Sequence, residues 1–251
     1  MIIHDIYDFI NEIAPFSKAE EWDNCGLLLG SHSAECQKIM LALDLTQEVA
    51  KQAIEQQVDL IITHHPVIFS PLKSIDFSSP IAKLIMARIC VISAHTCFDV
   101  AVGGMNDILC EKLGLKDVRT VTGDDGFSFR IGCTSAPVLA KEFAKHTANT
   151  LGSNCVCSSL GEKTIQTVAV CSGAGSCVVP FLKVLGIDAL VTGELKYNNV
   201  IDLYEDEIAA IVAGHFETES IFKEALKSML LKRFYGIDVV IADEKPYLTG
   251  V

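Results

Sequence analysis

Two short stretches of this sequence have the same order of residue types, and they limit the fold more than any other feature. Residues 59–63 read DLIIT and residues 188–192 read DALVT. Each follows a strand-like apolar run and then a helix-like segment. In the first half the run is residues 39–43 and the helix residues 47–57, and in the second half they are residues 167–170 and 177–185. A strand–helix–strand order of this kind favours a parallel sheet.

The similarity continues further along each half. A second helix is predicted at residues 80–88 and again at residues 198–204, and each leads into an apolar strand that ends in histidine. These strands read VISAH at residues 91–95 and IVAGH at residues 211–215, and we align them residue by residue. Each histidine is followed four positions later by an acid, so both halves end in the pattern H-x-x-x-acid.

The repeated order predicts an α/β fold with two similar lobes that arose by internal duplication. The first lobe is predicted to span residues 1–126 and the second residues 127–251. A chance likeness between two unrelated strand–helix–strand units is the alternative. If the lobes face each other, the side chains that follow their strand ends line a single cleft.

The composition narrows the kind of partner. With 251 residues, of which 50% are hydrophobic, the chain can bury one large core or two of ordinary size. Its net charge is −12 and no stretch is rich in Lys and Arg, which argues against nonspecific binding to nucleic acid or to an anionic membrane. We therefore expect a small-molecule or metal partner.

Two apolar segments have neither the pattern of a signal peptide nor that of a membrane-spanning helix. Ile3, Ile6, Ile10 and Ile13 recur at helical spacing with acids between them, which predicts an amphipathic helix rather than a signal peptide. Gly, Pro, Lys and Asp interrupt the run at residues 167–191 before it reaches the roughly 20 clean residues that a span needs. A soluble, cytoplasmic protein with no membrane partner is expected.

The ten cysteines are expected to be reduced and buried. Most lie in apolar segments, as do Cys90, Cys110, Cys171 and Cys177, and no C-x-x-C pair occurs. A disulfide or zinc role is the alternative. The close C-V-C pair at residues 155–157 is left open.

Several potential metal ligands follow the predicted strand ends. They are His64, His65, His95, Asp99, His215 and Glu219. Imidazole and carboxylate donors without cysteine suit Zn²⁺, Mn²⁺ or Fe²⁺ rather than Ca²⁺. Two such ions bridged by a carboxylate would activate a water for hydrolytic attack.

The histidines admit more than one role. Pro66 restricts the preceding residue to an extended conformation, so His64 and His65 are expected to point to opposite sides of the chain. They can bind two metals, or one metal and a supporting group, or they are ordinary loop histidines. His95 can be a ligand, a donor that orients one, a general acid or base, or a histidine that only ends a strand. We predict that it lies beside the ligands as the catalytic residue.

The segment AGHFETE at residues 213–219 offers two acids after His215. A helix is predicted to begin near Thr218, whose hydroxyl would cap it. Its buried stripe would consist of Ile221, Phe222, Ala225, Leu226, Met229 and Leu230. Glu219 would then lie in the first turn and tilt back toward His215, whereas Glu217 is expected to face solvent.

Two further motifs carry weaker signals. CSGAGS at residues 171–176 lies between a predicted strand and helix, so its N–H groups can cradle a phosphate or another anion. It lacks the spacing of a P-loop or a dinucleotide loop, and a plain tight turn is the alternative. WDNCG at residues 22–26 joins the single tryptophan to an Asx-type turn, which is typical of a structural role.

Five motifs in this order resemble those of one protein family. They are WDNxGL (residues 22–27), THHP (63–66), AHTxxD (94–99), TGE (192–194) and GHFxTE (214–219). From Ile6 to Tyr247 the chain resembles the short form of the GTP cyclohydrolase 1 type 2 homologues, also described as NGG-interacting-factor-like dinuclear-metal proteins. The resemblance implies two α/β lobes, a two-metal site in the cleft between them and a ring-shaped homohexamer.

The resemblance also implies a ligand set and an activity. The metal ligands would be His64, His65, Asp99, His215 and Glu219, with Glu219 bridging two divalent ions per subunit, which are Zn, Mn or Fe. Relatives often carry a histidine after the TGE motif, whereas residues 195–199 here read LKYNN. The implied function is a metal-dependent hydrolase acting on a nucleotide or a related phosphorylated small molecule. A metal-handling or regulatory protein without turnover, and an oligomer that its metals only hold together, are the alternatives.

Overall fold

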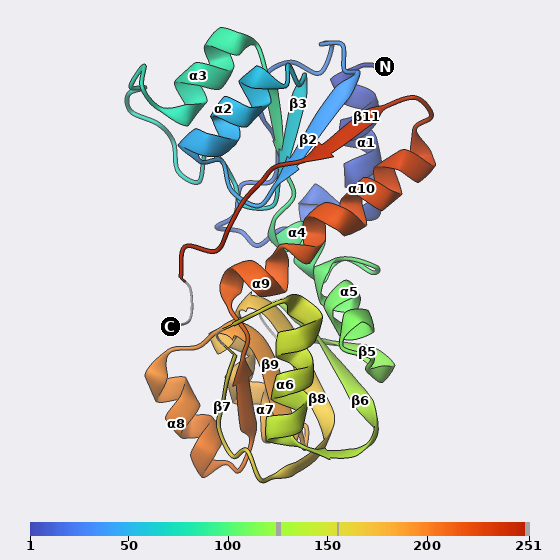
Figure 1. The fold of residues 1–251 in the computed structure, drawn as a ribbon, viewed down its shortest axis with the longest axis vertical. Helices are drawn as coiled ribbons and strands as arrows, with labels where there is room; N and C mark the ends of the chain where they lie inside the picture. The colour runs from blue at the N-terminus through green and yellow to red at the C-terminus, as the bar shows by residue number, and fades with distance from the viewer. Residues whose placement is uncertain (124–126, 155, 249–251) are drawn as a thin grey trace. The chain divides into compact units, whose positions relative to one another are not determined.

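The chain folds into two compact α/β units (Figure 1). The computed structural model describes residues 1–123, 127–154 and 156–248. The first unit consists of Met1–Val102 and Phe222–Lys245, and the second of Gly103–Ile221 with the residues from Pro246 onward. An α/β fold with two units was predicted, but the predicted boundary between residues 126 and 127 does not match this division.

Strand pairing explains why the boundary differs. Strand β11 (Asp238–Ile241) lies at the edge of the first sheet, where it pairs in parallel with β2 (Lys38–Ala42). Figure 1 shows the two strands side by side, one in blue and one in red. Strands β5 (Lys116–Thr122) and β6 (Ser128–Leu139) form an antiparallel pair across the predicted boundary. A cut at residue 126 would therefore break one sheet and leave the other without an edge strand.

The first unit is built on a five-stranded sheet in the order β1-β4-β3-β2-β11. Its remaining strands are β1 (Gly26–Leu29), β3 (Leu60–Thr63) and β4 (Cys90–Ser93), and only β1 is antiparallel to its neighbour. Its helices are α1 (Ile3–Ile13), the 3₁₀ turn η1 (Phe16–Lys18), α2 (Gln47–Glu55), α3 (Pro80–Ala87), α4 (Thr96–Val100) and α10 (Ile221–Arg233), the last beginning at the junction.

The second unit contains a six-stranded sheet in the order β5-β6-β8-β9-β10-β7. Strands β8 (Thr164–Ala174), β9 (Ala189–Glu194) and β10 (Ala209–Val212) are parallel, whereas β7 (Cys157–Ser158) is antiparallel to β10. The helices are α5 (Met105–Lys112), α6 (Ala140–Leu151), the 3₁₀ turn η2 (Gly175–Val178), α7 (Val179–Leu182), α8 (Tyr197–Glu205) and α9 (His215–Glu219).

Local sequence accounts well for these elements. The strands that lie inside the parallel sheets are continuous apolar runs, and Leu60–Thr63 is buried throughout. Thr46 caps α2 by accepting a hydrogen bond from the backbone N–H of Val49 at 3.1 Å, and Ser79 caps α3 with Pro80 in its first turn. Each fully buried aliphatic side chain stabilises the fold by roughly 1.5–3 kcal/mol. The predicted strand–helix–strand order is confirmed in both halves.

Two equivalent carboxylates support the predicted duplication. Oδ2 of Asp59 accepts hydrogen bonds from the backbone N–H groups of residues 37 and 38, at 2.8 and 3.0 Å. Oδ2 of Asp188 accepts from those of residues 166 and 167, at 2.9 and 2.8 Å. In each unit an aspartate before the second parallel strand thus ties down the start of the first.

The sheet registers correct the predicted alignment of the two halves by one residue. Thr63 lies opposite Ser93 in the first sheet, and Thr192 lies opposite Val212 in the second. Since Thr63 and Thr192 are equivalent, Ser93 corresponds to Val212 rather than to Ala213. The residue-by-residue match of VISAH with IVAGH is therefore wrong, because spacing along the chain does not reveal which residues pair across a sheet.

The same correction applies to the helices that follow. Helix α9 begins at His215, not near Thr218, and its preceding residue is Gly214. The hydroxyl of Thr218 does not cap a helix. It donates a hydrogen bond to the carbonyl oxygen of Gly214, one turn earlier, at 2.9 Å. Helix α4 begins one residue after His95. His95 therefore precedes its helix, whereas His215 lies in the first turn of the equivalent one.

Cysteine burial agrees only in part with expectation. Cys36, Cys90, Cys97, Cys110 and Cys171 are buried, whereas Cys177 is exposed because it lies in the turn η2. Cys155, of the pair that was left open, falls outside the described residues. In the part of the chain that the structure describes, no helix has both the length and the hydropathy needed to cross a bilayer.

Replacing Asp188 with alanine should loosen the start of β8. Loss of the two bonds to the carboxylate should lower the local opening free energy by about 2 kcal/mol, so the amides of residues 166 and 167 should exchange about 30-fold faster. The amides of residues 37 and 38 should stay unchanged, and Asp59→Ala should give the reverse pattern. Hydrogen exchange followed by mass spectrometry measures both. Equal effects in both units would contradict the equivalence.

Candidate metal centre

Three histidines of the first unit form a cluster at the carboxyl ends of neighbouring parallel strands. His64 and His65 follow β3, and His95 follows β4. One ring nitrogen from each lies within 4.8 Å of those of the other two. The rings of His64 and His65 are centred only 5.2 Å apart, so both reach the cluster. The prediction that the two side chains point to opposite sides of the chain is therefore wrong.

The backbone after β3 brings the two adjacent histidines together. The N–H groups of His64 and His65 continue the ladder to the carbonyl oxygens of Ala42 and Leu43, at 3.2 and 3.0 Å. The hydroxyl of Thr63 then donates to the carbonyl oxygen of His65 at 2.8 Å, which turns the chain. The pair thus sits on sheet backbone and a local turn, which are more precise supports than a free loop.

Each imidazole of the cluster is oriented through Nδ1. The acceptor is the carbonyl oxygen of Ala94 for His64 (2.9 Å), Oδ1 of Asp44 for His65 (2.8 Å) and Oδ1 of Asp23 for His95 (2.9 Å). Because a carbonyl or carboxylate oxygen only accepts, Nδ1 carries the hydrogen in each neutral ring. Nε2 then carries the lone pair that a metal ion or a proton takes.

Asp23 is the most strongly held carboxylate of the cluster. Its side chain is buried and also accepts a hydrogen bond from the backbone N–H of Thr96 at 3.0 Å. Burial by itself would raise the pKa of Asp23, but the hydrogen bonds from His95 and Thr96 outweigh it and hold the pKa well below the usual value. The group is therefore a carboxylate that fixes the ring of His95.

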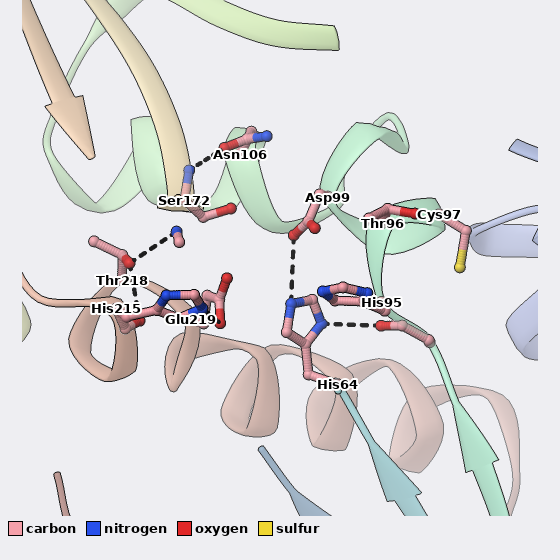
Figure 2. A network of polar contacts seen from close by, with 12 residues as sticks. His64, His95, Thr96, Cys97, Asp99, Asn106, Ser172, His215, Thr218 and Glu219 are labelled. Atoms are coloured by element: carbon pink, nitrogen blue, oxygen red, sulfur yellow. Dashed lines mark hydrogen bonds and ion pairs between the residues drawn. The ribbon is translucent and has the colours of Figure 1, made fainter. Parts of the chain in front are cut away.

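Asp99 lies with His64 rather than with His95, whose H-x-x-x-acid pattern it completes. Its Oδ1 is 3.5 Å from Nε2 of His64, and a dashed line in Figure 2 marks this pair. His95 is turned toward Asp23 instead. A separation of 3.5 Å between a ring nitrogen and a carboxylate oxygen suits two ligands of one ion, and both side chains are largely buried.

The second unit brings His215 and Glu219 together on α9. Nε2 of His215 is 3.0 Å from Oε2 of Glu219, and Oε1 of Glu194, at the end of β9, is 3.6 Å from Nδ1 of His215. Glu219 is buried, with only 3% of its surface exposed. Glu217 turns its carboxylate toward the backbone of Gly214 and is more exposed. The structure therefore places Glu219, and not Glu217, beside His215, as predicted.

Glycine at position 173 makes room for this pair. Gly173 has a φ of +58°, and a Cβ there would meet Oε1 of Glu219 at 2.1 Å and Nε2 of His215 at 3.2 Å. Gly193 is equally tight, since its Cβ would lie 2.8 Å from Cα of His215. Both glycines belong to motifs that the sequence singled out, but their steric role depends on packing against α9.

The CSGAGS segment does not form an anion cradle through its first N–H groups. Residues up to Ala174 belong to β8, and the following residues form η2. The N–H of Ser172 donates to Oδ1 of Asn106 at 2.8 Å, and that of Gly173 to the hydroxyl of Thr218 at 3.2 Å, the first of which Figure 2 shows. These two donors bind side chains of α5 and α9 and are therefore already used within the fold.

The donor chemistry fits a divalent metal ion. The cluster offers neutral imidazoles held by acceptors on the far ring nitrogen, the arrangement found in many metal-ligating histidines. Asp99 adds a carboxylate in the same unit, and the second unit has a histidine and a carboxylate of its own on α9. Asp23, Asp44 and Gly173 were not predicted as site residues; an acid or glycine near a motif carries no signal until its partner is known.

The fold and these residues define a protein of two α/β units with a histidine group that could hold a metal ion. The sequence matches the family described as Duf34/NIF3 (NGG1p interacting factor 3) over residues 1–246, and the chain belongs to this family.

Curated relatives and solved structures agree with this assignment. A Campylobacter jejuni protein named GTP cyclohydrolase 1 type 2 homolog is 31% identical over 233 residues, 90% of each chain. A Clostridium perfringens protein of the same name is 33% identical over 238 residues, 87% of each. The Staphylococcus aureus hypothetical protein SA1388 superposes with a TM-score of 0.90 at 26% identity over 99% of each chain. Reduced HcgD from Methanocaldococcus jannaschii gives 0.83 at 25%, over 97% of this chain and 98% of its own.

Replacing Gly173 with alanine should cost more stability than the same change at Gly152. Both have positive φ, +58° and +67°, so both should lose about 1–2 kcal/mol from backbone strain. A Cβ at Gly152 meets nothing within 4 Å, whereas at Gly173 it displaces Glu219. Urea unfolding should show the larger loss for Gly173→Ala, and the NMR signals of the His215 ring should shift in that variant alone. Equal losses would contradict the packing argument.

Proposed function

We propose that the protein binds two divalent metal ions, Zn²⁺, Mn²⁺ or Fe²⁺, and hydrolyses a nucleotide or a related phosphorylated small molecule. The proposed ligands are His64, His65, Asp99, His215 and Glu219. This would require the donor groups of the two units to meet in one site, where Glu219 would be shared by both ions. The shared cleft was expected from the sequence, and it is part of the proposal.

The observation that carries the proposal is the prior orientation of the histidine cluster. All three rings present Nε2 because all three Nδ1 atoms are held by an acceptor. Their ligand atoms already lie within 4.8 Å of one another. Binding an ion at His64 and His65 would need little further ordering of these side chains, so most of the binding free energy would be retained, and His95 would lie beside the ion.

The carboxylates add a second argument. A buried carboxylate is costly unless a cation or hydrogen bonds offset its lost hydration. Glu219 is buried beside His215, and Asp99 is largely buried beside His64. Two largely buried carboxylates beside two imidazoles are a donor set that a divalent cation would stabilise.

The chain's own residues then divide the chemistry. A bound divalent ion would polarise a substrate oxygen and lower the pKa of a water molecule toward neutral pH. His95, held by Asp23, is proposed to take or return a proton at Nε2. Asp23 keeps the ring in one tautomer and stabilises it when it becomes charged. Asp44 likewise keeps the ring of His65, a proposed metal ligand, in one tautomer.

The substrate class comes from the relatives. Two of them are named GTP cyclohydrolase 1 type 2 homolog, so a purine nucleotide is the first substrate to test. Opening its imidazole ring would need water to attack C8 and a proton donor such as His95. A homohexameric ring is proposed on the same resemblance, and light scattering measures the mass that tests it.

Replacing Glu219 with glutamine should abolish hydrolysis. The amide keeps the shape but loses the charge that two ions need, so metal binding should weaken at least about tenfold at one ion. Protein loaded with Mn²⁺, Zn²⁺ or Fe²⁺ is assayed with GTP and a panel of phosphoesters, with calorimetry for the ions. Glu217→Gln is the matched control and should retain activity. No activity in the wild type, or equal activity in both variants, would refute the hydrolase proposal.

Substitutions of Asp44 and Asp23 should show which histidine is a metal ligand and which carries a proton. Asp44→Ala should weaken metal binding by about tenfold, because His65 loses the partner that orients it. Asp23→Asn should lower turnover by about 10²–10⁴-fold with a changed pH profile, because an amide favours the wrong tautomer of His95. If His95 is instead a metal ligand, Asp23→Asn will reduce metal affinity as much as Asp44→Ala does.

A metal-handling role without turnover is the second candidate. Partial exposure of the His65 and His215 side chains, 25% and 37%, favours an ion that exchanges with solvent. Rapid transfer of the ion to an apo-acceptor, with no hydrolysis of any substrate, would select this role. A purely structural role for the metal would instead show as unfolding on chelation.

A further inference from the structure

Two aromatic side chains of the first unit lie together on the surface. Trp22 is 56% exposed and Phe69 is 53% exposed. Their ring centroids are 5.6 Å apart and the ring planes are inclined by 33°. We call this pair the aromatic platform. The WDNCG turn predicted around the single tryptophan leaves its indole on the surface.

The platform is held firmly. The side-chain amide of Asn24 donates to the carbonyl oxygen of Ile68 at 2.6 Å and so joins the segments that carry Trp22 and Phe69. The N–H of Asn24 donates to the buried carboxylate of Asp23 at 2.7 Å. A fixed apolar surface of this kind loses little entropy when it binds a ring, which is the condition for useful affinity.

The platform lies directly beside the histidine cluster. The ring of Trp22 meets that of His95 edge to face, with centroids 5.9 Å apart and an angle of 71°. The His95 ring is in turn centred 5.2 Å from that of His64 and 5.4 Å from that of His65. A flat ligand stacked on Trp22 would therefore have its polar edge within reach of the cluster.

We propose that Trp22 and Phe69 bind the planar heteroaromatic ring of the substrate by stacking. This rests on the proposed function, whose site it extends. An exposed aromatic ring can stack on one base, and stacking accepts any base because every base has a π-face. Glu20, Glu21 and Asp23 adjoin the tryptophan in the chain, and a net charge of −12 disfavours a polynucleotide. A single nucleotide fits better.

The chain provides its own reporter, because Trp22 is its only tryptophan. Metal-free full-length protein is titrated with GMP, AMP and ribose 5-phosphate, with excitation at the red edge of the tryptophan band. GMP and AMP should quench the emission with similar affinities, and ribose 5-phosphate should not. Absence of quenching by either nucleotide, or equal quenching by the sugar phosphate, overturns the proposal.

Phe69→Leu keeps the reporter while removing one ring. The apparent dissociation constant for GMP should rise about tenfold. Phe77→Leu is the matched control, since Phe77 lies in the same connection between β3 and α3, is 83% exposed, and should leave the constant unchanged. An equal rise in both variants overturns the role of the platform.

A second copy of the chain is the competing occupant. In that case the emission of Trp22 would change with protein concentration alone, Phe69→Leu would shift the mass measured by light scattering, and GMP would have no effect. That result overturns the proposal. The titration needs neither metal nor turnover, so quenching without hydrolysis would refute the hydrolase while leaving the platform in place.

Discussion

The alignment of parallel strand ends is the constraint on which the candidate donor groups of each unit depend. In the first sheet the ladder sets Thr63 opposite Ser93, which brings the residues after β3 and β4 to one edge. In the second it sets Thr192 opposite Val212, with α9 starting three residues beyond. The register of a strand decides on which face of the sheet each of its side chains lies. A slip of one residue would therefore move the donor groups away from one another.

Polar support around the donors turns this alignment into usable chemistry. Ala94, Asp44 and Asp23 hold three rings in the tautomer that presents Nε2. The second unit uses a different device, in which Gly173 and Gly193 let α9 approach the sheet closely enough to bury Glu219. The two units of a duplicated fold have thus taken different roles, and the histidine and acid of the H-x-x-x-acid pattern contact each other in the second unit but not in the first.

Periodicity and motif predicted much of this protein from its residues. Continuous apolar runs and the histidines at strand ends were sufficient for the strand–helix–strand order, the α/β class and the main candidate donors. They failed where the outcome depends on distant partners. The position of β11 beside β2 moved the domain boundary, and the role of Asp23 became clear only with His95 beside it.

The sequence by itself determined which segments become strands and helices and which chemical groups follow them, because hydrophobic periodicity and turn chemistry act over a few residues. Only the tertiary structure decided which groups meet. Asp99 faces His64, not His95, and Trp22 lies beside Phe69 on the surface. Such contacts follow from sheet register and packing between segments far apart in the chain, which local preferences do not specify.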